Sequence, residues 1–186
     1  MRIGYLTSKG VFEEVHGSDT RLNTSSRSSQ RIHYISRDDG QAYTVTSHDG
    51  TAAAGTYPIY LQNTSSSGLL LYVDKIMVGG VETALWKVWF VTGTASGSSV
   101  LTATNINKAS SNAAAINARG DGPVSSLTTD GQIWAARTDA SAHDEVRFDD
   151  AVILGQNDAI AVEIDTDDGT PNVAEVSISF YLETAE

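Results

Sequence analysis

From Gln41 onward the sequence repeats one pattern, in which short runs of β-branched and aromatic residues alternate with clusters of Gly, Asn, Asp and Ser. Such runs are typical of strands, and the clusters are typical of the tight turns between antiparallel strands. The pattern predicts nine strands, over Ala42–Ser47, Tyr57–Asn63, Leu69–Val78, Leu85–Thr92, Val100–Thr104, Gln132–Arg137, Val146–Leu154, Ala159–Asp165 and Val173–Leu182. Many short strands with Gly-rich turns favour a sandwich or a barrel, because packed sheets each bury one face.

The segments between these strands carry the residues that turns require. We expect turns at Asp49-Gly50, Ser67-Gly68, Gly79-Gly80, Asp130-Gly131, Gln156-Asn157-Asp158 and Asp168-Gly169. Ala109–Ala118 is the one stretch with some helical character, but Ser and Asn interrupt it. It is predicted to be a loop with at most one helical turn.

The predicted strands differ in how many of their faces are apolar. In Val173–Leu182 apolar and polar residues alternate, which predicts one buried face. Leu85–Val91 is apolar on both faces. Either a neighbouring subunit or a loop of the same chain covers its second face, and Trp86 and Trp89 are therefore candidates for an oligomer interface.

Residues 1–40 are predicted to form an N-terminal arm, and residues 41–186 the sandwich domain. The segment Thr20–Arg37 contains five Ser, four Arg and no acidic residue. It buries too little apolar area to become ordered alone, although Ile32, Tyr34 and Ile35 could pair with the edge of a neighbouring sheet. It is either a solvated tail or an arm that docks on an acidic partner or a neighbouring subunit. The candidate docking residues are Arg21, Arg27, Arg31 and Arg37.

Charge and composition narrow the range of partners. Residues 1–50 hold six basic and six acidic residues, so the remainder of the chain carries the whole net charge of −11. An acidic body repels phosphate backbones, so no nucleic-acid partner is expected. The longest apolar run, Leu69–Val73, is far shorter than the ~20 residues that cross a bilayer. The N-terminus has no cleavable apolar stretch, so neither membrane insertion nor secretion is expected.

The sequence offers little material for catalysis, and we expect no enzymatic activity, no cofactor and no metal site. There is no cysteine, which excludes thiolate metal sites and cysteine nucleophiles. There is also no nucleophile elbow, Walker loop or dinucleotide-binding glycine motif. The histidines are scattered along the chain, at His16, His33, His48 and His143.

Three groups of residues that contain acidic side chains are candidates for binding or catalysis. Asp165–Gly169 resembles part of a calcium loop, but its spacing is incomplete, and an acidic turn is the simpler interpretation. Arg119-Gly120-Asp121 matches the tripeptide that integrin ligands display, although a match of three residues arises often by chance. Glycoside hydrolysis needs a pair of carboxylates, which could come from Asp144, Glu145, Asp149 and Asp150. A solvated acidic edge is the simpler interpretation of these four residues.

Several stretches resemble the jelly-roll proteins of tailed-bacteriophage virions, and most of all the capsid decoration, or cement, proteins. The resemblance covers residues 41–184 and lies in strand rhythm and loop composition. It is carried by Leu61–Thr64, Leu69–Val78, Leu101–Asn107 and Ala151–Val162.

This resemblance implies a jelly-roll sandwich and a virion structural protein that decorates and stabilises a capsid. Its partners would be the major capsid protein and two further copies of itself in a homotrimer attached through the N-terminal arm. The protein would be made in the host cytoplasm and lie on the outer capsid surface. On this interpretation the strand with Trp86 and Trp89 forms the trimer interface. The alternatives are the head of a tail fibre or receptor-binding protein, with a loop such as Asn105–Pro123 facing the host, and a glycosidase.

Overall fold

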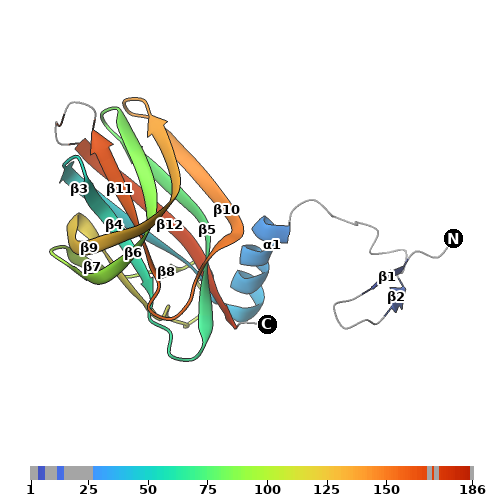
Figure 1. Cartoon of the computed structure of the whole chain (residues 1–186). Helices are drawn as coiled ribbons and strands as arrows, with labels where there is room; N and C mark the ends of the chain where they lie inside the picture. Colours follow the sequence, from blue (N-terminus) through green and yellow to red (C-terminus); the bar gives the residue numbers. More distant parts are fainter. Residues whose placement is uncertain (1–3, 7–11, 15–26, 167–168, 170–171, 185–186) are drawn as a thin grey trace.

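The computed structural model describes residues 4–6, 12–14, 27–166, 169 and 172–184 (Figure 1). An antiparallel pair, β1 (Gly4–Leu6) and β2 (Phe12–Glu14), is followed by helix α1 (Arg27–Tyr34) and a turn of π-helix, η1 (Ile35–Asp39). The remaining elements are all strands. They are β3 (Ala42–Ala52), β4 (Thr56–Asn63), β5 (Leu69–Gly80), β6 (Ala84–Ser96), β7 (Ser99–Leu101), β8 (Thr104–Asn105), β9 (Ile116–Thr138), β10 (His143–Leu154), β11 (Ala159–Thr166) and β12 (Asn172–Thr184).

The strands form two five-stranded sheets packed face to face, which confirms the predicted all-β antiparallel sandwich. One sheet has the order β10-β5-β12-β3-β8, and the other has the order β4-β11-β6-β9-β7. The long strands pair from the outside of the sequence inwards, as β3 with β12, β4 with β11, β5 with β10 and β6 with β9. A long hairpin rolled up in this way is a jelly roll, so the connectivity agrees with the expected architecture.

The main core lies between the two sheets and follows from the alternation of each strand. In β12 the side chains of Val176, Ile178 and Phe180 are all buried, as the sequence pattern predicts. They pack against the apolar face of β11, where Ile160 and Val162 are completely enclosed. This core holds the sheets at a fixed distance and so positions the outer faces described below.

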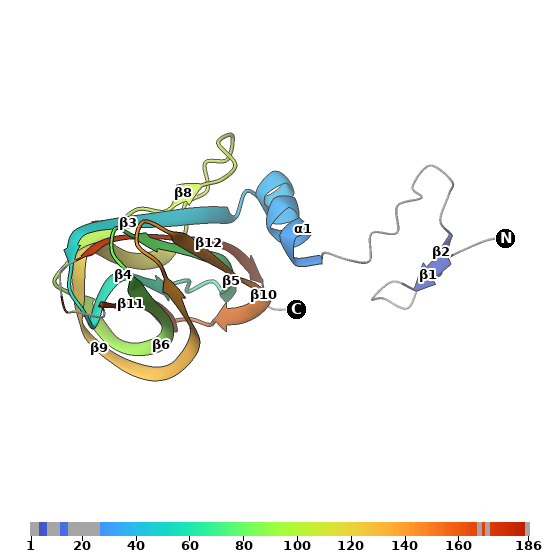
Figure 2. The same ribbon diagram turned by 90° about the horizontal axis from the view of Figure 1, so that it is seen from above.

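The second sheet curls until β4 also pairs with the first half of β9 (Figure 2). Because β9 runs unbroken from Ile116 to Thr138, it reaches β6 with one half and β4 with the other. The turn predicted at Asp130-Gly131 is therefore wrong, since Gly131 pairs with Phe90 inside the ladder. The curl encloses a second apolar cluster that includes Tyr60 and Val124.

Helix α1 packs on the outer face of the first sheet, beside β5 and β10 (Figures 1 and 2). Ile32 and Ile35 lie one helical turn apart and are buried against Ala42 and Tyr181. The sequence suggested that these two residues pair with a sheet edge, but in the structure they lie in helical segments instead. Residues 27–39, which the sequence pattern assigned to the arm, are thus packed on the body of the protein.

Candidate functional site

Of the two tryptophans predicted at an oligomer interface, one lies inside the subunit and the other is partly buried. Trp86 is 0% exposed within the main core, and its indole Nε1 donates a hydrogen bond of 2.9 Å to the Thr138 hydroxyl. Trp89 points to the other side of β6 and packs, partly buried, in the second cluster with Tyr57 and Leu127. The chain's own curl therefore covers the second face of this strand. The assignment of Trp86 to a subunit seam is corrected, because its side chain offers no surface to another molecule.

Arg31 fastens helix α1 to the sandwich. Its Nε and Nη2 donate hydrogen bonds of 2.9 and 2.6 Å to one carboxylate oxygen of Glu183 on β12. Its guanidinium also lies 5.8 Å from the ring centroid of Tyr72, which stacks on Tyr181 at 4.9 Å. Arg31 thus binds an acidic residue of its own chain, Glu183. The sequence had suggested an acidic partner surface or a neighbouring subunit instead.

The other three predicted docking arginines have different environments. The guanidinium of Arg37 donates to both carboxylate oxygens of Asp38 at 2.7 and 3.0 Å, and this hydrogen bonding lowers the pKa of Asp38. Arg37 remains 75% exposed, so it faces solvent with its charge balanced by its neighbour. Arg27 begins helix α1, and Arg21 lies outside the described residues.

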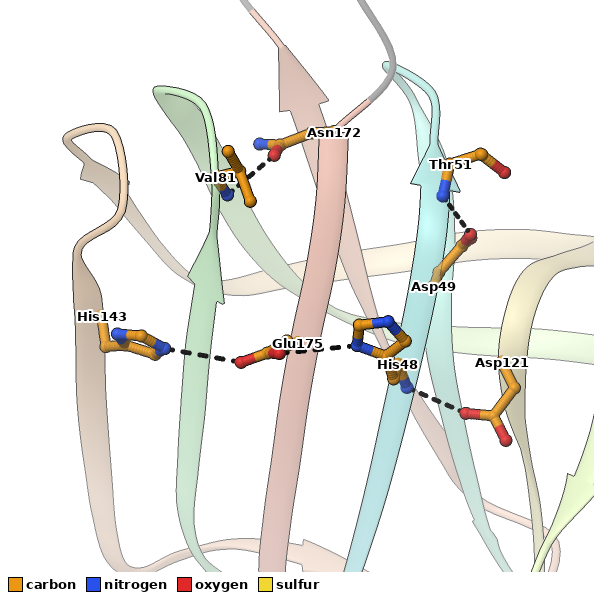
Figure 3. Close-up of polar contacts among 8 residues, drawn as sticks. All are labelled: His48, Asp49, Thr51, Val81, Asp121, His143, Asn172 and Glu175. Atoms are coloured by element: carbon orange, nitrogen blue, oxygen red, sulfur yellow. Dashed lines mark hydrogen bonds and ion pairs between the residues drawn. The ribbon is translucent and has the colours of Figure 1, made fainter.

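A row of polar side chains crosses the outer face of the first sheet at the end remote from α1 (Figure 3). Glu175 on β12 lies between two histidines, with one carboxylate oxygen 3.5 Å from His48 Nδ1 and the other 3.6 Å from His143 Nε2. All three side chains are more than half exposed. Gly79 occupies the intervening position on β5, where a Cβ atom would lie 2.2 Å from the His143 ring. The sequence analysis missed this row because His48 and His143 are brought together by strand register.

Asp121 closes the same row at the β3 side (Figure 3). Its carboxylate accepts a hydrogen bond from the backbone N–H of His48 at 2.8 Å, and its own N–H donates to the Ser47 hydroxyl at 2.8 Å. Arg119 lies within β9 between β4 and β7, where it donates to the Ser98 carbonyl at 3.1 Å. The Arg119-Gly120-Asp121 tripeptide is thus built into a sheet, which is unlike the exposed loop that an integrin ligand presents.

The carboxylates of β10 are divided among separate contacts. Glu145 accepts hydrogen-bonded ion pairs from Lys75 at 3.1 Å and from Arg147 at 2.7 Å, and the Lys75 hydrogen bond lowers the pKa of Glu145. Asp150 accepts a hydrogen bond of 2.6 Å from the Tyr181 hydroxyl. Asp144 accepts from the backbone N–H of Glu145. These carboxylates are thus engaged in separate contacts, and the solvated acidic edge stays a prediction.

The turn that resembles a calcium loop is described in part. The Asp165 carboxylate accepts a hydrogen bond of 3.1 Å from Lys87, whose ammonium also contacts Glu163. Asp167 and Asp168 lie outside the described residues. Within the part of the chain that the structure covers, no group of three or more His, Cys, Asp or Glu side chains is arranged to hold a metal ion. Nor does any helix there have the length and apolar character needed to span a bilayer.

Compared with known proteins, the chain matches no protein-family model, no curated protein and no solved structure. Its function is therefore argued from the geometry described above.

Proposed function

We propose that the chain is a structural protein of a bacteriophage virion, which decorates and reinforces the outer capsid surface as a homotrimer. Its partners are the major capsid protein and its own copies, and it reaches the capsid from the host cytoplasm. The observation that carries the proposal is the attachment of helix α1 to the sandwich. The Arg31–Glu183 pair and the buried Ile35 hold α1 on the sandwich, so the segment that precedes α1 is joined to a rigid body.

The edges of the two sheets support the same proposal. Open strand edges invite uncontrolled pairing between molecules, a hazard for a protein present in many copies on one particle. In this protein β8 has two residues and β7 has three, so two of the edges are short. The third, β10, is interrupted by a register shift between Arg147 and Val152. Such edges suit a module that stands beside identical neighbours without aggregating.

The packing of α1 on the sandwich determines which N-terminal truncation can test attachment through the arm. Removal of residues 1–40 would delete Ile32 and Ile35 from the apolar cluster against Tyr181, so a loss of capsid binding could reflect damage to the body. Removal of residues 1–26 leaves α1 and its clamp in place. We expect this shorter truncation to keep the melting temperature of the full chain and to lose co-sedimentation with purified, expanded phage heads. Retained binding would contradict attachment through the arm.

Charge reversal provides the matched control. Arg21→Glu alters the segment that the truncation removes, and Lys108→Glu makes the same change on a loop of the body. We expect the first variant to weaken co-sedimentation and the second to leave it unchanged. The mass of the purified full chain tests the oligomer: the proposal requires three times the subunit mass of 19.7 kDa, and a stable monomer would exclude the homotrimer.

Electron microscopy of labelled particles separates decoration from the tail-fibre alternative. Decoration places density over the whole shell, whereas a fibre head places it at the tail or the vertices. The loop considered for receptor contact is tied to the body, because Asn107 and Asn112 donate side-chain hydrogen bonds of 2.9 Å to the carbonyls of Ser36 and Asp39. Such anchoring favours a structural role for this loop.

A further inference from the structure

The end of β8 and the loop that follows it lie against η1, beside α1 (Figure 2). Two amide side chains of this loop donate hydrogen bonds to η1. Asn107 Nδ2 lies 2.9 Å from the carbonyl oxygen of Ser36, and Asn112 Nδ2 lies 2.9 Å from that of Asp39. Because the last carbonyls of a helix have no partner within the helix, the loop supplies acceptors of η1 with the donors that they lack.

Gly40, which follows η1, is a second point of attachment. Its carbonyl accepts hydrogen bonds from Asn105 Nδ2 at 2.8 Å and from the Ser110 hydroxyl at 3.2 Å. Gly40 adopts the left-handed conformation, with φ of 61°. A Cβ atom at this position would lie 2.4 Å from the Ser110 hydroxyl oxygen, so the close approach of the loop requires glycine. The loop therefore holds the junction between η1 and β3.

The asparagines of this loop use both ends of their amide groups. Asn105 Oδ1 accepts a hydrogen bond from the backbone N–H of Asn107 at 2.9 Å, and Asn107 Oδ1 accepts one from Ala109 at 3.0 Å. These contacts fold the loop, whereas the Nδ2 groups contact Gly40 and Ser36. Aspartate could make only the first kind of contact, because a carboxylate has no N–H to donate. The amide nitrogen is therefore the group that joins the loop to η1.

Apart from this loop, a small set of contacts holds α1 and η1 on the sandwich. The apolar cluster beneath them is separate from the main core, and its buried members are Ile32, Ile35, Ala42 and Tyr181. The Arg31–Glu183 ion pair adds one polar contact. The strand ladders of the first sheet begin at Ala42, after both helices have ended. The helices are thus attached to the sandwich by side chains rather than by a ladder of backbone hydrogen bonds.

The packing beneath α1 is also incomplete. A cavity of about 180 Å³ lies between the helical side, which contributes Ile32 and Ser36, and the sheet, which contributes Asp74 and Ser179. Helix and sheet do not touch at this point, so their interface gains less from dispersion than a filled core does. Segments with few buried contacts open locally at a lower free energy than the core strands of the same protein. We therefore expect α1 and η1 to open before the sandwich unfolds.

We propose that Asn105–Asn112 is a strap that locks α1 and η1 on the sandwich, and that breaking the strap releases both helices as one unit while the sandwich stays folded. Lys108 and Ser111 of the strap are exposed, so the strap is accessible from outside. A molecule that binds the strap amides in place of η1 favours the released state, since a ligand shifts a population toward the state that it binds better. This inference concerns the chain itself and holds whether or not it decorates a capsid.

The experiment is native-state hydrogen exchange of the full chain, followed by NMR. In the wild type, we expect the amides of α1 and η1 to share one opening equilibrium and to exchange faster than those of β12. Asn107→Asp keeps the acceptor that folds the loop but removes the donor to Ser36. It should speed exchange in α1 and η1 by about tenfold or more, the typical effect of leaving a partly buried carbonyl unpaired, and leave β12 unchanged. Asn157→Asp makes the same change in the exposed turn before β11 and should alter neither helix.

A second variant keeps the test decisive if Asn107→Asp does not fold. Asn112→Asp removes the donor to Asp39 at an exposed contact, and should speed exchange in the same two helices by a smaller factor. Equal protection of η1 and β12 in the wild type would overturn the proposal. So would unchanged exchange in the folded strap variants, or faster exchange in β3 and β12 to the same degree as in η1.

Discussion

The hydrogen bond between Trp86 and Thr138 gives the sharpest test of the core assignment. Trp86 is 0% exposed and Thr138 is 3% exposed, so neither group can exchange this 2.9 Å bond for one with water. Thr138→Val has nearly the same shape and leaves no cavity, but it removes the acceptor of the indole N–H. An unsatisfied buried donor costs about 1–3 kcal/mol. For a domain of this size, that loss lowers the melting temperature by about 2–12 °C.

The assay is thermal and urea unfolding followed by circular dichroism at one protein concentration, in a double-mutant cycle with Trp86→Phe. Phe has no N–H group, so Thr138→Val should cost almost nothing in that background. The coupling energy between the two sites should therefore be about 1 kcal/mol or more. The reasoning is refuted if Thr138→Val is equally costly in both backgrounds. A change in oligomer mass with unchanged stability would instead return Trp86 to an interface.

Three further predictions concern the outer face of the first sheet. Burial raises the pKa of Asp74 in the folded state above its ordinary value of 3.8. Between the unfolded-state and the folded-state pKa, the folded protein therefore binds more protons than the unfolded chain, and its stability falls as the pH rises through that window. Asp74→Asn should remove this slope, as measured by urea unfolding at several pH values. Gly79→Ala should displace the exposed ring of His143 and shift its imidazole resonances but not those of His48, while stability changes by less than about 1 kcal/mol. Ile35→Ala removes a side chain that is 2% exposed, and should cost about 2–4 kcal/mol and speed amide exchange in η1. Arg31→Ala breaks an ion pair whose side chains are 37% and 23% exposed, and should cost about 1 kcal/mol or less.

The sandwich itself could be predicted because its strands carry local signals. The alternation predicts the buried positions Ile160, Val162 and Ile164 of β11, although Ala161 on the other face is buried as well. Predicted turns are found at Ser67-Gly68 and Gln156-Asn157-Asp158, whereas Asp49-Gly50 lies inside β3. Only Gln132–Arg137 of β9 was predicted as a strand, about a quarter of its length, since Asp130-Gly131 is a strong turn signal that the pairing with β6 overrides. Helix α1 was missed because its composition is polar, although Ile32 and Ile35 have the i, i+3 spacing of a helical face.

The outer face could not be predicted in the same way, because register decides it. His48, Glu175 and His143 meet across strands that are far apart in the sequence, and a shift of one residue would turn each side chain to the other face. Asp74 gives no sign in the sequence of its burial, since the register shifts beside it arise from pairing with β10 and β12. The role of Trp86 was mistaken because a strand with two apolar faces does not reveal whether its own chain or another covers it.

The rolled-up order of the strands also constrains how the protein is made. β12 occupies the centre of the first sheet, between β5 and β3, yet it follows every other strand in the sequence. On the ribosome, β3 and β5 are therefore synthesised long before the strand that joins them. A nascent chain that stops before β12 holds two exposed edges and no complete core, so folding has to wait for translation of almost the whole sequence. Chaperone contact during synthesis should accordingly persist until β12 has emerged.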